Sequence, residues 1–437
     1  MSEENKETAK SNNVFRSRNF RLVFLGALVS ELGAILYSFA VSFYILEISG
    51  NNPFLQGLYL ALCGISLLLF TPVGGVLGDR FNKAKIMYIC DYIKGGTIIL
   101  ATVLMLLFPE AQAHIIILFA LGILGNAVSG VFTPASNSLF PHIVDDDRIQ
   151  QATSYFTIKS SLESILGIIL AGILYGTMKI QTLFMLVGIC FVASGVSEMF
   201  IKYEHHVPEE RLTLKIAARD MKEGLVYLKN QKAILALLFA ILFINFFFTP
   251  ITGNFLPYFI RTDLAEAPSF LFDNLLTPEL WSSVFSVCYG ASSLVAAAIL
   301  SAGKQPDRCG FKVAVRICVI AAVMVALTVT YRQFVDKGNA INSFLISFSL
   351  GSILIGFLLS YINIPISTAF LRSVDKEMLS KVNSITSIGS QGMTPLASVL
   401  AGAVLESMGS TMLLALCTAG FTITAFLLLI NRPVRNL

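Results

Sequence analysis

Charged residues are scarce in this chain. Only 13% of its 437 residues are Asp, Glu, Lys or Arg, whereas 55% are hydrophobic and the mean hydropathy is +0.75. A soluble domain carries about a quarter charged residues, so this scarcity excludes an ordinary water-soluble fold. The apolar residues fall in runs long enough for helices that cross about 30 Å of hydrocarbon. They lack the alternation of an outer-membrane barrel, so the sequence predicts an all-α integral membrane protein.

Motifs for metal, nucleotide and nucleophilic chemistry are absent from the sequence. The four histidines show no metal-binding spacing, and the seven cysteines include no CxxC pair. No P-loop is present, which argues against an ATP-driven pump, and no nucleophile elbow is present, which argues against a membrane-embedded enzyme. We therefore expect no enzymatic activity, no metal and no cofactor. The net charge of +4 is distributed between the apolar runs, so we expect no nucleic-acid partner.

Twelve apolar runs predict twelve transmembrane helices. Each run approaches the roughly 20 residues that a helix needs to cross the bilayer, and helices satisfy their backbone hydrogen bonds internally there. The predicted spans are 21–48, 54–78, 86–108, 112–138, 154–178, 182–200, 233–259, 280–302, 313–331, 342–368, 382–406 and 410–430.

The placement of Lys and Arg predicts the orientation of these spans. Of the 31 basic residues, 24 lie on the side of the membrane that carries the N-terminus and three lie within spans, and the opposite loops contain only Lys179, Arg261, Arg332 and Lys337. Basic residues concentrate on the cytoplasmic side. We therefore expect a multi-pass protein of the inner (plasma) membrane with both termini in the cytoplasm.

The chain contains an internal repeat on either side of a polar stretch. PHIVDDDRIQQATS (141–154) superposes on LRSVDKEMLSKVNS (371–384), and both segments lie on the predicted cytoplasmic side. We therefore expect two parallel-repeat six-helix bundles, at 1–200 and 233–437, that rock about a site near the bilayer midplane. The stretch 201–232 is predicted to be a cytoplasmic linker with an amphipathic helix.

The turn after the second predicted span carries a motif. GGVLGDRFNKAK (74–85) resembles the G-x-L-x-D-R-x-G-R-K signature of the major facilitator superfamily, and QPDRCGFK (305–312) is a second-half copy. Asn82 stands where glycine is usual, and asparagine tolerates the left-handed backbone that glycine adopts. The resemblance implies the major facilitator fold and transport by alternating access.

The resemblance also suggests residues that control gating. In the family, the motif Asp latches one of the two conformational states, a role that would fall to Asp79. With it we group the charged residues of both motif copies and a spaced pair in the third span: Arg80, Lys83, Asp91, Lys94, Asp307 and Arg308.

Other segments resemble the macrolide-efflux and siderophore-exporter branch. These are DRFNKAKIMYICD, FTPASNSLFPHIVDDDRIQQATS and EGLVYLKN. The usual activity of that branch is export of amphipathic compounds driven by the proton gradient. The resemblance therefore implies a small amphipathic substrate, a proton gradient as the energy source, and a monomer whose other partner is the lipid bilayer.

Charged residues within the spans are candidates for transport chemistry, because burying a charge in a bilayer costs a few kcal/mol. Glu31 lies in the first span, where it either exchanges a proton for a cationic group of the substrate or forms a structural hydrogen bond between helices. Lys159 and Glu163 are one turn apart in the fifth span. They either form an intrahelical ion pair or contribute Glu163 to the transport site as a second carboxylate. Four uncharged candidates for lining a cavity are Asn126, Tyr37, Asn245 and Tyr361.

Three functions remain compatible with these residues. The first is secondary active export of small amphipathic compounds such as drugs or siderophores. The second is a lipid or lysolipid flippase, or a facilitated uniporter of the same fold. The third is a transporter-like receptor without flux. A direct flux assay separates the receptor from the other two.

Overall fold

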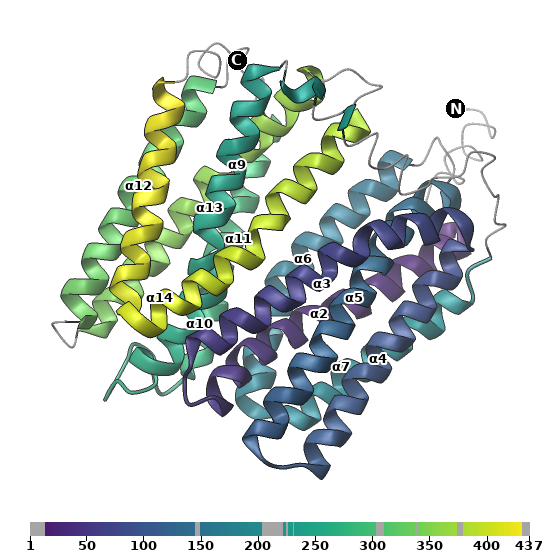
Figure 1. Ribbon diagram of the computed structural model, residues 1–437, viewed down its shortest axis with the longest axis horizontal. Helices are drawn as coiled ribbons and strands as arrows, with labels where there is room; N and C mark the ends of the chain where they lie inside the picture. Colours follow the sequence, from purple (N-terminus) through teal and green to yellow (C-terminus); the bar gives the residue numbers. More distant parts are fainter. Residues whose placement is uncertain are drawn as a thin grey trace, which may run out of the picture. The chain divides into compact units, whose positions relative to one another are not determined.

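The computed structural model describes residues 14–144, 149–202, 222–223, 226–229, 231–302, 310–336, 340–373 and 379–430. Within these residues the regular structure is helical (Figure 1). The elements of the first half are η1 (Val14–Arg16), α2 (Arg18–Ile48), α3 (Pro53–Arg80), α4 (Lys83–Leu107), α5 (Ala111–Ile143), α6 (Ile149–Thr177) and α7 (Ile180–Met199). The second half comprises α9 (Lys232–Pro250), η3 (Ile251–Phe255), α10 (Leu256–Phe259), η4 (Ile260–Leu264), α11 (Pro278–Ala302), α12 (Gly310–Thr330), η5 (Tyr331–Asp336), α13 (Ile341–Ser373) and α14 (Leu379–Ile430).

The predicted membrane-spanning fold is confirmed. In the described part of the chain, 11 helices are long and apolar enough to cross a bilayer. The last of them, Gly392–Ile430, has 39 residues, and a helix of that length extends about 58 Å. It contains a break at Gly409, whose φ of 80° and ψ of 177° are non-helical. The break falls between the predicted spans 382–406 and 410–430, so α14 contains both.

The seventh predicted span is longer than the sequence indicated. We expected it to end at residue 259, but α9, η3, α10 and η4 continue without interruption to Leu264. Pro250 lacks the backbone N–H that an α-helix needs, and the chain widens into a π-helical turn directly after it. Arg261 and Asp263 are consequently helical residues, whereas the sequence placed them in an external loop.

Asn82 does not adopt the left-handed backbone that the motif suggested. Its φ is −60° and its ψ is 114°, and its side chain accepts a hydrogen bond from the backbone N–H of Lys85 at 3.2 Å. An asparagine in this role satisfies one of the free N–H groups at the start of a helix. Asn82 therefore begins α4 as its N-cap.

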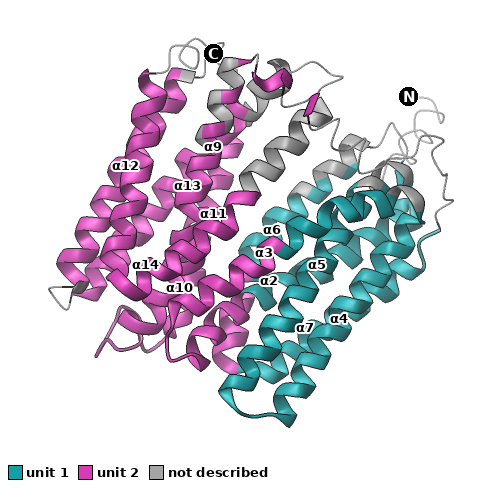
Figure 2. Ribbon diagram, in the orientation of Figure 1, with its two compact units in different colours: residues 1–38, 66–167, 178–214 teal, residues 39–65, 168–177, 215–437 magenta. Residues whose placement is uncertain are grey.

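The helices form two compact units, shown in different colours in Figure 2. Unit 1 contains residues 1–38, 66–167 and 178–214. In it α4 packs against α5 and α7. Glycines allow the α4–α7 contact to be close, because Gly95 faces the backbone of Gly188 and Gly195 faces the ring of Tyr92.

Unit 2 contains residues 39–65, 168–177 and 215–437. It therefore combines helices of the second repeat with the ends of α2, α3 and α6 that lie near the α2–α3 turn, here called the α2–α3 end. Contacts there are tight: a Cβ at Gly57 would collide with the carbonyl oxygen of Ser398, and one at Gly402 would lie 2.6 Å from the carbonyl oxygen of Pro53. The predicted bundle boundaries at 200 and 233 stay a prediction.

Several predicted features lie outside the described residues. These are most of the linker 201–232 and the second motif copy with Asp307 and Arg308. The backbone of Asp79 and Arg80 ends α3, but their side chains are also outside the described part.

Candidate functional site

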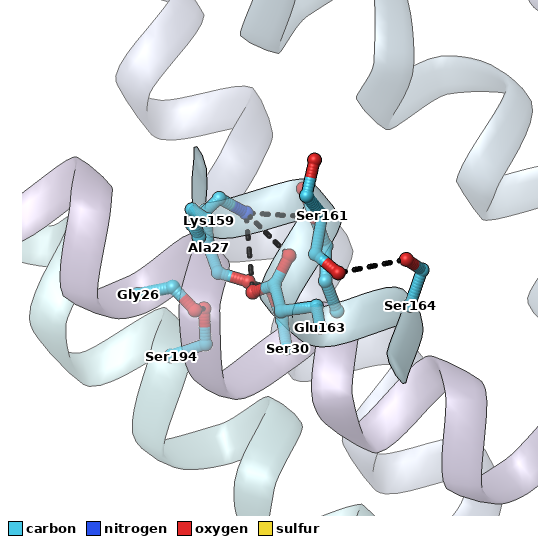
Figure 3. Close-up of polar contacts among 9 residues, drawn as sticks. Gly26, Ala27, Ser30, Lys159, Ser161, Glu163, Ser164 and Ser194 are labelled. Atoms are coloured by element: carbon cyan, nitrogen blue, oxygen red, sulfur yellow. Dashed lines mark hydrogen bonds and ion pairs between the residues drawn. The ribbon is translucent and has the colours of Figure 1, made fainter. Parts of the chain in front are cut away.

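Three ionisable side chains meet between α2 and α6. Lys159 Nζ lies 2.7 Å from Glu31 Oε2 on α2, and 3.1 Å and 3.3 Å from the two carboxylate oxygens of Glu163 on its own helix. Figure 3 shows these contacts as dashed lines that converge on the Lys159 ammonium. The expected i,i+4 ion pair is present, and Glu31 extends it across the helix contact. We call Glu31, Lys159 and Glu163 the triad.

The members of the triad differ in burial. The side chains of Lys159 and Glu163 are 1% and 3% exposed, whereas that of Glu31 is 52% exposed. With all three groups ionised, two carboxylates share one ammonium and the triad carries a net charge of −1. Glu31 is the exposed member of the triad, and Lys159 holds its carboxylate.

The triad lies far from the ends of its helices. Glu31 is 13 residues from the first residue of the 31-residue α2, which corresponds to about 20 Å along the axis. Such a position places a carboxylate deep in the hydrocarbon layer, where a charge needs compensating partners.

The helix that carries Glu31 is fixed against α7. Ser194 donates a hydrogen bond to the carbonyl oxygen of Gly26 at 2.9 Å, and Ser197 donates to that of Leu22 at 3.1 Å. Gly26 makes this contact close, since a Cβ there would lie 3.3 Å from Ser194 Oγ. The position of Glu31 therefore depends on α7 as well as on α6.

The uncharged candidates are divided between the two units. Tyr37 packs on the Phe184 ring, and Asn126 donates to the Gly122 carbonyl oxygen one turn earlier on α5. The guanidinium of Arg316 lies 5.0 Å from the centre of the Tyr361 ring. Asn245 is half-buried on α9. Tyr37 and Asn126 belong to unit 1, and Tyr361 and Asn245 belong to unit 2, so a role for them in transport stays a prediction.

The gating candidates in α4 lie beside an acid that the sequence reasoning missed. Lys83 is buried at the start of α4, and Asp91 is fully buried further along it. Glu198 on α7 is fully buried as well and interacts electrostatically with Asp91 and Lys94. An acid within an apolar span is the signal that identified Glu31, and Glu198 carries that signal too. It was overlooked because it directly precedes the polar linker.

A second polar cluster, here called the end cluster, joins four segments at the α2–α3 end. Tyr175 on α6 donates to Glu47 on α2 at 3.0 Å. Arg261 on η4 lies 3.5 Å from the same Glu47 oxygen and 3.8 Å from Glu279 at the start of α11. All four residues belong to unit 2. The cluster and the glycine contacts link these helices at the α2–α3 end.

The fold and the sequence agree on the family. A family model described as Major Facilitator Superfamily matches residues 23–393. The chain belongs to the Major Facilitator Superfamily. The relatives that it matches in this superfamily are named as transporters or efflux proteins.

Two relatives show where in this superfamily the similarity lies. Uncharacterized MFS-type transporter YkuC of Bacillus subtilis (strain 168) is 24% identical over 297 residues, 66% of this chain and 65% of YkuC. Macrolide efflux protein A of Streptococcus pyogenes is 23% identical over 237 residues, 54% of this chain and 57% of that protein. The chain thus spans 57–65% of the length of these two relatives.

A solved structure confirms the major facilitator fold. A bacterial homologue of the iron transporter ferroportin, in an inward-facing state, superposes with a TM-score of 0.71 at 14% identity. The match covers 95% of this chain and 98% of the homologue.

Proposed function

We propose that the protein is a proton-coupled exporter of small amphipathic cations in the plasma membrane, with both termini in the cytoplasm. The observation that carries this proposal is the triad: a half-exposed carboxylate, deep in a membrane helix, bound to a buried ammonium that already has a second carboxylate. This arrangement binds one additional positive charge, which a proton or a cationic substrate can supply.

Competition for Glu31 gives exchange. With a proton on Glu31 the triad is neutral, and a cationic substrate has no free carboxylate to bind. When the proton leaves, the triad is negative and attracts the cation in a medium of low dielectric constant, where such attraction is strong. Because the two ligands exclude each other at one site that alternates between the two sides, proton entry drives cation exit.

The relatives support export as the direction of transport. Macrolide efflux protein A is named for a class of antibiotics, and macrolides of the erythromycin type combine a large apolar ring with a tertiary amine that is protonated at neutral pH. A cation of this kind suits a triad with one negative charge.

The closed α2–α3 end supports alternating access. In the proposed orientation this end faces outward, so the ion pairs of Arg261 and the helix contacts at Gly57 shut the external side. In such a state Glu31 releases its proton to the cytoplasm and takes up the substrate.

The proposal is tested by transport into proteoliposomes. The purified protein is assayed with erythromycin, tetraphenylphosphonium and a lysolipid, each with and without an imposed pH gradient. Cation transport that requires the gradient and is lost in Glu31→Gln supports the proposal. Cation flux that ignores the gradient indicates a facilitated uniporter, movement of the lysolipid alone indicates a flippase, and no flux of any compound indicates a receptor.

A further inference from the structure

Two buried acids, one on α4 and one on α7, interact electrostatically apart from the triad. Asp91 and Glu198 are both 0% exposed. They lie on the facing sides of the two helices, where Gly195 contacts the Tyr88 carbonyl oxygen and the Tyr92 ring. Among the described residues, none of their four carboxylate oxygens has a hydrogen-bond partner.

Two ionised carboxylates cannot remain in such a place at low cost. A buried charge without hydrogen bonds costs several kcal/mol, so a buried carboxylate takes up a proton instead. Ser194 lies beside Asp91, but its hydroxyl proton is already donated to the Gly26 carbonyl oxygen at 2.9 Å.

Lys94 compensates one negative charge, not two. Its ammonium lies 4.7 Å from the centre of the Phe132 ring and 5.3 Å from that of Phe191. Within the described residues it forms no ion pair closer than 4.0 Å, but it interacts electrostatically with Asp91, Glu198 and, more weakly, Glu31. One ammonium and two carboxyl groups are neutral together when the two acids share one proton.

The acid pair is connected to the triad through α2. A Cβ at Gly26 would lie 3.3 Å from Glu198 Cγ and 3.3 Å from Ser194 Oγ. Gly26 precedes Glu31 by five residues, or about 7.5 Å along the helix axis. The pair therefore lies between Glu31 and the N-terminal end of α2, which is the cytoplasmic end in the proposed orientation.

We propose that Asp91 and Glu198 form a second proton-binding site, through which the proton of Glu31 leaves for the cytoplasm. In this step Glu31 loses its proton to the acid pair, and the pair loses a proton to the cytoplasmic water, so charge is conserved. The charged groups near the pair are Lys94 on α4 and Glu31 on α2, and Cys90 is a further titratable neighbour. From α5, the uncharged ring of Phe132 packs against the Lys94 ammonium. The role of the pair in proton release rests on the proposed function. The presence of a proton on the pair does not.

The proton itself is tested without any substrate. Infrared difference spectra of the protein in liposomes, recorded as the pH is stepped, report the C=O stretch of a protonated carboxyl group. We expect a protonated-carboxyl band in Glu31→Gln, where the triad no longer takes up a proton at this position, and its loss when Asp91→Asn and Glu198→Gln are added to that variant. Glu110→Gln, which changes an exposed acid at the start of α5, is the control and retains the band. A Glu31→Gln protein without such a band, or a triple variant that keeps it, overturns the proposal.

The path is tested by separating driven transport from exchange. In proteoliposomes, Glu198→Gln is expected to lower erythromycin transport driven by a pH gradient by about two orders of magnitude, while erythromycin counterflow without a gradient is unchanged. Asp91→Asn serves as the independent second variant. Unchanged driven transport in both variants, or equal loss of counterflow, contradicts the path. If wild-type protein moves neither erythromycin nor tetraphenylphosphonium, the proposed function has failed, and the infrared band alone decides whether the pair holds a proton.

Discussion

Lys159 on α6 donates a 2.7 Å hydrogen bond to Glu31 on α2. The ammonium is nearly fully buried and the carboxylate is half-exposed, so the hydrogen bond links a buried side chain of α6 to an exposed side chain of α2. A structural hydrogen bond and a coupling site were the two interpretations of Glu31 in the sequence. The hydrogen bond between the helices is present, and the coupling site stays a proposal.

Removal of the buried ammonium is expected to destabilise the protein. Lys159→Met leaves Glu163 buried without its counter-ion, which costs about 3–5 kcal/mol. Thermal unfolding in detergent measures the loss, and the double variant Lys159→Met, Glu163→Gln should recover most of it. If the single and double variants unfold at the same temperature, Glu163 does not depend on Lys159.

Cation binding is expected to strengthen as the pH rises. Protons and cations compete for Glu31, so fewer protons on the site leave more of it free for tetraphenylphosphonium, whose own charge does not change with pH. Binding of this cation to solubilised protein, measured by calorimetry, should tighten with increasing pH and then level off. Glu31→Gln should abolish this dependence, and an affinity that falls with rising pH would contradict the competition.

Arg261 is expected to keep the external end closed. Spin labels at Thr177 and Leu275, both exposed residues of unit 2, report the separation of α6 from the segment before α11. Arg261→Gln removes the ion pairs with Glu47 and Glu279 and should shift the label distances to longer values. Arg332→Gln, an exposed arginine on η5, is the matched control. Identical distance distributions for wild type and Arg261→Gln would show that the end cluster does not control closure of this end.

Gly57 is expected to control the same closure by a steric route. Its missing side chain lets α3 approach the Ser398 backbone, so Gly57→Ala should open the external end even where high salt screens the Arg261 ion pairs. The same labels measure the effect. Gly253→Ala is the control, because a Cβ there would meet a single side-chain atom at 3.9 Å. A closed end in Gly57→Ala would show that the helices separate without strain at this contact.

The sequence predicted the helices well because the length of an apolar run is set by the bilayer, a constraint that is local along the chain. It therefore predicted a boundary between two spans near Gly409. It also predicted the Lys159–Glu163 ion pair, because the two residues are spaced by one helical turn. It could not pair Glu31 with Lys159, or Arg261 with Glu47, because those contacts depend on how distant helices pack. Arg261 was placed in a loop because a charged residue at the end of an apolar run ends a predicted span, and its partners were not visible.

Proton release on substrate binding tests the central claim most directly. Solubilised protein in weakly buffered solution with a pH indicator is mixed with tetraphenylphosphonium at a pH where the triad holds its proton. The account predicts that the wild type releases protons as the cation binds and that Glu31→Gln releases none. Saturable binding of the cation to the wild type without any proton release across the accessible pH range would contradict competition at Glu31.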